Sequence, residues 1–170
     1  ETIGNYDVWT APDCYGTLHE TSYSTWFYFT VTGALEGEVL NLRILGMNPQ
    51  TKMFLNDMRP VFKSVPASPA WERMREPVQH GVNESPAGRK LFWLKFKHKV
   101  AGPGEVVHFA FTYPYSYAEC QNRLQQLEAQ ARGISGVFFQ RELLTRSVEG
   151  RNVDLITVTS NEGASTNTEP

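Results

Sequence analysis

The periodicity of apolar residues changes in the middle of the stretch FAFTYPYSYAECQNRLQQLEAQARG, residues 109–133. Before the change, aromatic side chains occupy alternate positions, which is the spacing of one face of a β-strand: Phe109, Phe111, Tyr113 and Tyr115. After Ser116, the apolar residues recur every three or four positions, as on one face of a helix. We therefore expect two different architectures to meet near Pro114.

The second architecture reads as helix, strand, turn and strand. Ser116 and Glu119 have the S-x-x-E spacing of a capping box, so a helix should begin after Ser116 and end at Gly133 in a left-handed conformation. The segments VFFQRELLTRS and VDLITVTS then predict strands on either side of the turn VEGRN. The uncharged run Leu-Ile-Thr-Val is typical of a strand buried in a large sheet. No second apolar element follows, so we expect an α/β domain that is cut short.

The first 112 residues predict an all-β fold, because short alternating segments are separated by Gly and Pro. We expect an antiparallel β-sandwich with strands in STWFYFTVTG, GEVLNLRILGM, RKLFWLKFKHKV and EVVHFAFTYPY. The segment TKMFLNDMRPVFKSV should form two short strands broken at Asn56-Asp57. The Pro-rich stretch 65–88 should be a long surface loop with at most one strand.

Charge and cysteine content narrow the class of partner. The 170 residues carry a net charge of −2, which points away from nucleic acid and anionic membranes as partners. The basic run KFKHK alternates with other residues, as on the solvent face of a strand. Cys14 and Cys120 form no Cys-x-x-Cys pair, and there is no signal peptide or long apolar run. An intracellular setting with two free thiols is expected, and a single disulfide is the alternative.

Six motifs, in order along the chain, carry a resemblance to a known family: NYDVWTAPDC, TWFYFTV, MRPVFKS, PAWERMR, HFAFTYPYSYAECQ and EGRNVDLITVTS. Together they resemble the amino-terminal region of the cytosolic carboxypeptidases, zinc enzymes that remove glutamates from tubulin and other proteins. The first, second and fourth motifs look most like the fifth type. The chain departs from the family pattern at Asp57, where Gly is usual, and at Thr112, where Cys is frequent.

The resemblance implies a division into three parts. Residues 1–114 would be a β-sandwich accessory domain, 115–160 the opening helix and strands of an α/β carboxypeptidase domain, and 161–170 a polar tail. The chain starts without Met, and we expect it to be a segment of a longer protein. The implied partners are the parent's own carboxypeptidase domain and the glutamate-rich tails of tubulin or other proteins. The implied location is the cytoplasm, including microtubules.

The family's zinc chemistry needs clustered His and Glu ligands, and this sequence offers no such cluster. None of the four histidines has His-x-x-Glu or His-Glu-x-x-His spacing: His19, His80, His98 and His108. We expect no catalytic residue, metal ligand or cofactor in this chain, with zinc bound by the parent's catalytic domain. Glu72 and Glu76 are expected to be solvated surface groups, and Ser116 a helix cap rather than a nucleophile.

Two groups of residues remain candidates for function. The aromatic series is expected to pack at the domain junction, or alternatively to line a substrate cleft: Phe109, Phe111, Tyr113, Tyr115 and Tyr117. Basic residues from the loop and the longest strand are expected to contact acidic substrates: Arg73, Arg75, Lys95 and Lys97. Two other hypotheses stay open. The chain could be an independent β-sandwich interaction module completed by residues 116–160, or the parent could have lost its zinc ligands.

Overall fold

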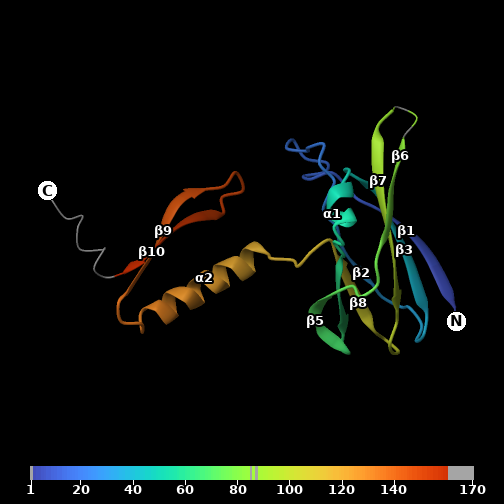
Figure 1. Ribbon diagram of the computed structural model, residues 1–170. Helices are drawn as coiled ribbons and strands as arrows, with labels where there is room; N and C mark the ends of the chain where they lie inside the picture. The colour runs from blue at the N-terminus through green and yellow to red at the C-terminus, as the bar shows by residue number, and fades with distance from the viewer. Residues whose placement is uncertain (1, 85, 87, 161–170) are drawn as a thin grey trace. The chain divides into compact units, whose positions relative to one another are not determined.

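The computed structural model describes residues 2–84, 86 and 88–160, and the predicted polar tail 161–170 lies outside them (Figure 1). The fold is mainly β, with two four-stranded sheets, a two-stranded hairpin and two helices among the described residues. The chain forms two compact units, one running to Pro114 and one beginning at Tyr115. The assignment of roles to the three predicted parts stays a prediction.

The first sheet of the first unit has the strand order β1-β3-β7-β6. Its strands are β1 (Ile3–Trp9), β3 (Val39–Met47), β7 (Lys90–Lys99) and β6 (Gln79–Glu84). Strands β3 and β7 are antiparallel, with Leu42 opposite Phe96. Strand β1 runs parallel to β3, so the expectation of a purely antiparallel fold is wrong for this pair. The sequence of β1 shows no apolar alternation. Only Gly4 and Val8 of this strand are partly buried.

The second sheet is antiparallel throughout and has the order β2-β8-β4-β5. Its strands are β2 (Tyr28–Val31), β8 (Val106–Ala110), β4 (Val61–Val65) and β5 (Ser68–Arg73). Alternate side chains of both sheets are buried in one shared core, in which the rings of Phe96 and Phe109 lie 5.6 Å apart. Because side chains alternate along a strand, the residues between these buried positions face solvent.

The prediction of a short strand before Asn56 is wrong. Residues 51–55 form a short helix, α1 (Thr51–Leu55), rather than a strand. A helical turn lets Phe54 alone enter the core, where its ring stacks on Phe92 at 5.4 Å, while Met53 and Leu55 stay exposed. An alternating strand would also bury the residues two positions from Phe54, and these residues, Lys52 and Asn56, are both exposed. The turn after the helix uses Asp57 at φ 61°, in the left-handed region that favours Gly.

The stretch 65–88 contains two strands, β5 and β6, rather than at most one. Both are edge strands, one in each sheet. An edge strand packs less side-chain surface and tolerates Pro, such as Pro69 in β5, because one row of its backbone groups needs no partner strand. The sequence therefore lacked the apolar alternation by which strands are recognised.

The second unit contains a capped helix and a hairpin. Helix α2 (Tyr117–Ala131) starts as predicted: Glu119 N donates to Ser116 Oγ at 3.2 Å, and Ser116 N donates to Glu119 Oε2 at 2.6 Å. The expected left-handed ending at Gly133 is wrong, since the helix ends with Arg132 at φ −60° and the positive φ of 82° belongs to Gly136. The residue with positive φ lies three positions after the predicted one. The difference is small, because any residue that leaves the helical conformation can end the last turn.

The hairpin pairs β9 (Val137–Arg146) with β10 (Asn152–Ser160), as predicted around the turn at Gly150. A half-buried ion pair joins Arg141 to Asp154 at 3.0 Å, and Gln121 of α2 donates to the same carboxylate at 2.8 Å. The hydrogen bond from Arg141 lowers the pKa of Asp154. Within the described residues β10 pairs only with β9, and Val158 is 64% exposed.

His98 is the inward-facing histidine of β7. Its ring lies 4.8 Å from Phe62 and 5.4 Å from Phe109, and its Nε2 is buried without a hydrogen-bond partner among the described residues. Burial lowers the pKa of His98, and attraction to Glu105 opposes this effect only in part. Burial also raises the pKa of Glu105, but the amides of Ala101 and Gly102, at 2.5 and 3.2 Å from Oε2, help to hold it below its usual value.

We expect Phe109→Ala to destabilise the first unit by about 3–5 kcal/mol, because it removes a fully buried ring from the middle of the core. The measurement is urea unfolding followed by tryptophan fluorescence. Tyr113→Ala is the matched control, since this side chain is 49% exposed and its loss should cost far less. Equal destabilisation by the two substitutions would contradict the burial pattern.

We expect Ser116→Ala to destabilise α2 by about 1 kcal/mol, because it removes the oxygen that accepts from Glu119 N. Hydrogen exchange of the amides in the first helical turn should become faster. Ser116→Thr retains the acceptor and should restore most of the protection. Unchanged exchange in Ser116→Ala would show that the capping box contributes nothing measurable.

We expect the first unit to lose stability as the pH falls below about 6.5, the ordinary histidine value. Because the folded-state pKa of His98 is depressed, the unfolded chain binds more protons in this range, and acid favours unfolding. His98→Phe should therefore show a smaller decrease in the free energy of unfolding between neutral and mildly acidic pH. His108, whose pKa is also lowered by burial, keeps its contribution in both proteins. Identical pH profiles would contradict the role given to His98.

Candidate functional site

The solvent face of the first sheet carries polar and cationic side chains on its two central strands. In β7 the inward residues Phe92, Leu94 and Phe96 are buried, so the residues between them face outward. The outward series continues to the end of the strand: Trp93, Lys95, Lys97 and Lys99. Opposite them, the register places Arg43 beside Lys95 and Asn41 beside Lys97. This face is therefore hydrophilic because the other face fills the core.

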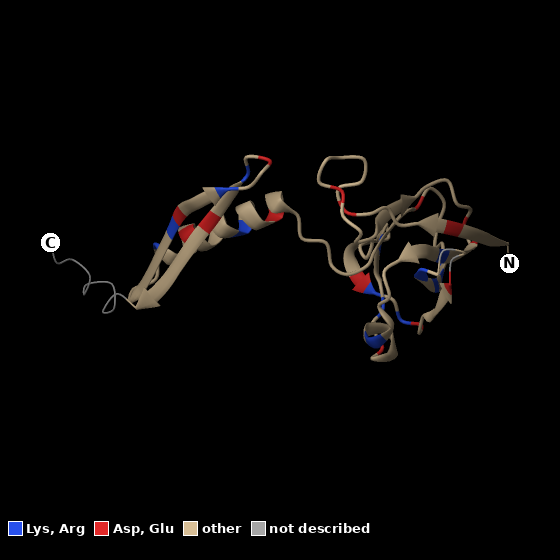
Figure 2. Cartoon of the chain, turned by 90° about the horizontal axis from the view of Figure 1, so that it is seen from above, with Lys and Arg blue, Asp and Glu red and all other residues tan. Residues whose placement is uncertain are grey.

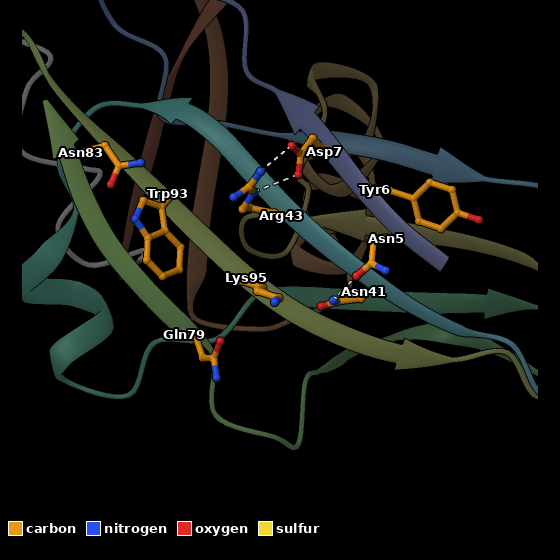
Figure 3. A pocket seen from close by; sticks show the side chains of 9 residues that line it. All are labelled: Asn5, Tyr6, Asp7, Asn41, Arg43, Gln79, Asn83, Trp93 and Lys95. Atoms are coloured by element: carbon orange, nitrogen blue, oxygen red, sulfur yellow. Dashed lines mark hydrogen bonds and ion pairs between the residues drawn. The ribbon is translucent and has the colours of Figure 1, made fainter. Parts of the chain in front are cut away.

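A hollow of about 360 Å³ lies on this face and is lined by four carboxamide side chains, from Asn5, Asn41, Gln79 and Asn83 (Figure 3). Two fixed contacts cross it between β1 and β3. Arg43 donates to Asp7 through Nε at 2.9 Å and Nη2 at 2.6 Å, and Asn41 donates to Asn5 at 2.5 Å.

The Arg43–Asp7 pair sets the charge balance of this hollow. Hydrogen bonding to Arg43 lowers the pKa of Asp7, so the carboxylate stays ionised and neutralises the guanidinium near neutral pH. Both side chains are solvent-accessible, so the pair contributes little to the stability of the fold. Its main effect is to hold two side chains that line the hollow in place. Lys95 then supplies the net positive charge of the hollow.

Trp93 forms one wall of this hollow and depends on a glycine beneath it. A Cβ atom at Gly81 of β6 would lie 2.8 Å from Cζ2 of the Trp93 indole, closer than real Cβ contacts. The absence of that atom lets the indole lie directly over the neighbouring strand. Gly81 is therefore required by close approach of a ring rather than by a special backbone conformation.

Two further hollows continue along β7. A hollow of about 210 Å³ shares Asn41, Gln79 and Lys95 with the first, and adds Lys97 and Glu76. A hollow of about 360 Å³ shares Lys97 and Glu76 with the second. It is also lined by Arg75 and Lys99, and on the side of the core by Phe62, Met74 and His98. We call these three adjoining hollows the β7 groove; five cationic side chains and two carboxylates line it.

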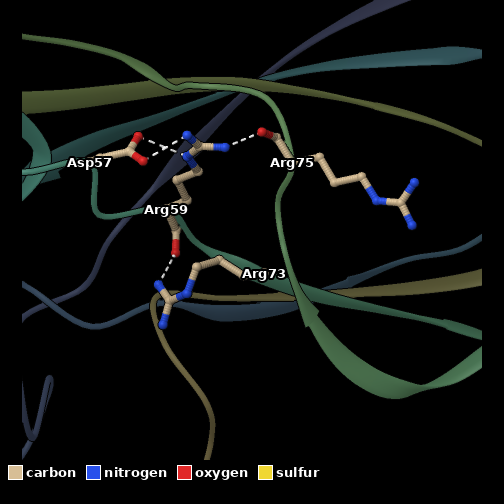
Figure 4. Close-up of polar contacts among 4 residues, drawn as sticks. All are labelled: Asp57, Arg59, Arg73 and Arg75. Atoms are coloured by element: carbon tan, nitrogen blue, oxygen red, sulfur yellow. Dashed lines mark hydrogen bonds and ion pairs between the residues drawn. The ribbon is translucent and has the colours of Figure 1, made fainter.

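The structure thus brings Arg75, Lys95 and Lys97 to one groove, while Arg73 makes other contacts (Figure 4). Arg73 donates to the carbonyl of Arg59 at 2.7 Å, and its guanidinium lies 5.5 Å from the centre of the Tyr113 ring. The contacts of Arg59 fix the backbone of this segment.

Arg59 forms a bidentate ion pair with Asp57, donating through Nε at 2.8 Å and through Nη2 at 2.7 Å. Its Nη1 also donates to the carbonyl of Arg75. The Arg75 side chain points away from this cluster and is 88% exposed, 4.0 Å from Glu72. The substrate contacts predicted for these residues stay a prediction. Charge is not segregated by unit, since both units carry Lys or Arg together with Asp or Glu (Figure 2).

The residues predicted at a domain junction lie in different environments. Phe109 and Phe111 are buried in the core of the first unit, and Tyr113 is half exposed there. In the second unit Tyr115 is exposed, and Tyr117 accepts a hydrogen bond from Asn152 N at 3.0 Å. A junction role for these residues stays a prediction.

Sequence reasoning missed the polar half of the β7 groove and a second surface cluster. The alternation of Val39, Asn41 and Arg43 against apolar neighbours was the available signal for the groove. The cluster lies on the second sheet, where Tyr28 and Trp71 pack edge to face at 5.7 Å beside His108. It joins residues that are far apart in sequence, and no local pattern marks it.

Among residues 2–84, 86 and 88–160, no group of three or more His, Cys, Asp or Glu side chains is placed to hold a metal ion. His80 stacks on Phe92 at 5.7 Å, and His108 Nδ1 lies 2.9 Å from Thr30 Oγ1. His98 faces the core, so the imidazoles of His80, His98 and His108 lie in three different environments. The residues present therefore do not fit the zinc site that the resemblance implies for the parent. Both cysteines are free thiols, as expected.

No helix within the described part of the chain is both long and apolar enough to cross a membrane.

Comparison with known proteins gives one consistent family. The chain is 37% identical to cytosolic carboxypeptidase-like protein 5 of Rattus norvegicus over 97% of its own length, which is 20% of that protein. The Danio rerio protein of the same name is 35% identical over 97% of the chain and 19% of that protein. Human cytosolic carboxypeptidase 6 is 30% identical over 91% of the chain and 29% of that protein.

No family model matches the chain. It spans about a fifth of the length of the first of these relatives. Over nearly all of its own length, the chain is homologous to a region of the cytosolic carboxypeptidase family, and within that family to cytosolic carboxypeptidase-like protein 5.

Proposed function

We propose that this chain is a noncatalytic accessory region of a cytosolic zinc carboxypeptidase that removes glutamates from tubulin and other proteins. In this proposal the first unit is the β-sandwich domain that precedes the enzyme. The second unit is the opening of the α/β catalytic domain. The homology over 97% of the chain is the observation that carries the proposal. Zinc and the catalytic residues then belong to the rest of the parent, and no step through zinc is derived from this chain.

The accessory role we propose is the docking of acidic protein tails in the cytoplasm, including those at microtubules. The cationic residues of the β7 groove support this role, since Arg75, Lys95 and Lys97 line one continuous surface. Exposed cations raise the local concentration of an acidic chain and speed its association, and the effect weakens with salt. The parent's catalytic domain is the second partner in this proposal.

The alternative is an independent sandwich module, which requires residues 116–160 to complete the sandwich. Within the second unit, β9 and β10 pair with each other. The parent gene offers a direct discrimination. A His-x-x-Glu motif downstream of Pro170 is expected if the parent is an active enzyme, and its absence would favour a parent that has lost its zinc ligands.

We expect the 170-residue chain to bind a glutamate-rich tubulin-tail peptide, with affinity several-fold weaker at about 300 mM than at about 50 mM salt. The measurement is fluorescence anisotropy of a labelled peptide. The matched control is the same peptide with Gln in place of Glu, which should bind weakly at both salt concentrations. Failure to bind the acidic peptide at low salt would contradict the docking role. The chain alone should show no glutamate release.

A further inference from the structure

The β7 groove has the length and form of a site for an extended chain. From Trp93 to Lys99 it follows seven residues of one strand, which is about 20 Å at the rise of a β-strand. Each hollow shares lining residues with the next, so the three hollows adjoin one another. A compact ligand would occupy one hollow, whereas an extended ligand can occupy all three.

We propose that the β7 groove binds an extended peptide with carboxylates at alternate positions, opposite Lys95 and Lys97. This inference rests on the proposed docking of acidic tails and adds where the tail lies and which charge spacing it needs. Within the described residues, neither Lys95 nor Lys97 forms an ion pair or a hydrogen bond through its ammonium group. Both are therefore available to a ligand.

The spacing argument follows from strand geometry. Lysines two residues apart on β7 lie about 6.7 Å apart along the strand, and alternate side chains of an extended peptide have the same spacing. A peptide with acidic residues at every second position can therefore place each carboxylate over this face. Two consecutive glutamates place one of their carboxylates on the opposite side, away from the lysines. The groove should thus distinguish peptides of equal net charge.

The rest of the lining fits a peptide better than a nucleic acid. The carboxamides of Asn5, Gln79 and Asn83 can each donate to and accept from peptide groups. Single-stranded nucleic acids are usually held by several aromatic side chains on which successive bases stack. The outward face of β7 offers one such ring, Trp93, and that ring lies over Gly81.

Glu76 is the element of this groove that opposes an acidic ligand. It lines the second and third hollows together with Lys97. A carboxylate at this point repels peptide carboxylates that are out of register and lowers the affinity for those in register. Removing its charge should therefore tighten binding of acidic peptides and weaken the selectivity for spacing.

The test compares two labelled peptides of equal length and net charge, Glu-Gly-Glu-Gly-Gly-Gly and Glu-Glu-Gly-Gly-Gly-Gly, on the 170-residue chain at low salt. We expect the alternating peptide to bind about threefold tighter, as one additional exposed ion pair provides. Lys97→Glu should weaken it about tenfold, because attraction becomes repulsion. Glu76→Gln should strengthen it. Lys52→Glu, on exposed α1, has the same charge change outside the groove and should alter binding little.

The outcomes separate this inference from the proposed function. Equal binding of the two peptides, or equal effects of Lys97→Glu and Lys52→Glu, would overturn the groove while leaving acidic docking intact. No binding of either hexapeptide, with the tubulin-tail peptide still bound, would also overturn the groove. Tighter binding of a single-stranded oligonucleotide than of the alternating peptide would overturn the choice of ligand. No binding of any acidic peptide, the tubulin tail included, would contradict the proposed function itself. Circular dichroism of each variant confirms that the fold is retained.

Discussion

The packing of β7 into the core between the two sheets is the constraint on which the other features of the first unit depend. Phe92, Leu94 and Phe96 are fully or almost fully buried, and Phe96 meets Phe109 from the opposite sheet at 5.6 Å. A slip of one residue would expose these side chains and bury three lysines, at a cost that no surface contact could offset. The register of β7 is therefore fixed by its apolar face, and the outward position of every lysine follows from it.

This constraint explains what could be predicted from sequence. Strands β3 and β7 are central, so each has a buried face that alternation reveals, and the helix start was evident because Ser116 and Glu119 are three residues apart. Three of the four edge strands of the first unit were not evident, whereas the edge strand β2 was predicted from the segment STWFYFTVTG. Strands β1, β5 and β6 take their positions from the hydrogen bonds of neighbouring strands rather than from their own side chains. The short helix α1 was missed because one buried ring, Phe54, defines no period.

The candidate site was predicted in part for the same reason. Lys95 and Lys97 belong to a strand whose faces could be assigned, so their exposure followed from alternation. Arg75 reaches the same groove through a segment whose course is set by the contacts of Arg59 with Asp57 and with the Arg75 carbonyl. The contact between Arg59 and the Arg75 carbonyl joins residues sixteen positions apart, so the local sequence does not reveal it. Arg73, two residues away, is used to hold this segment instead.

The carboxylates in the groove bear on specificity. A row of cations without them would attract any polyanion, nucleic acid included, because long-range attraction does not depend on register. Asp7 neutralises Arg43 at one end, and Glu76 lies beside Lys97 further along. The field is thereby reduced to a few cations at fixed spacing, so favourable binding requires carboxylates that meet them. In the proposed docking role, these carboxylates lower the affinity for acidic chains and increase the discrimination between charge patterns.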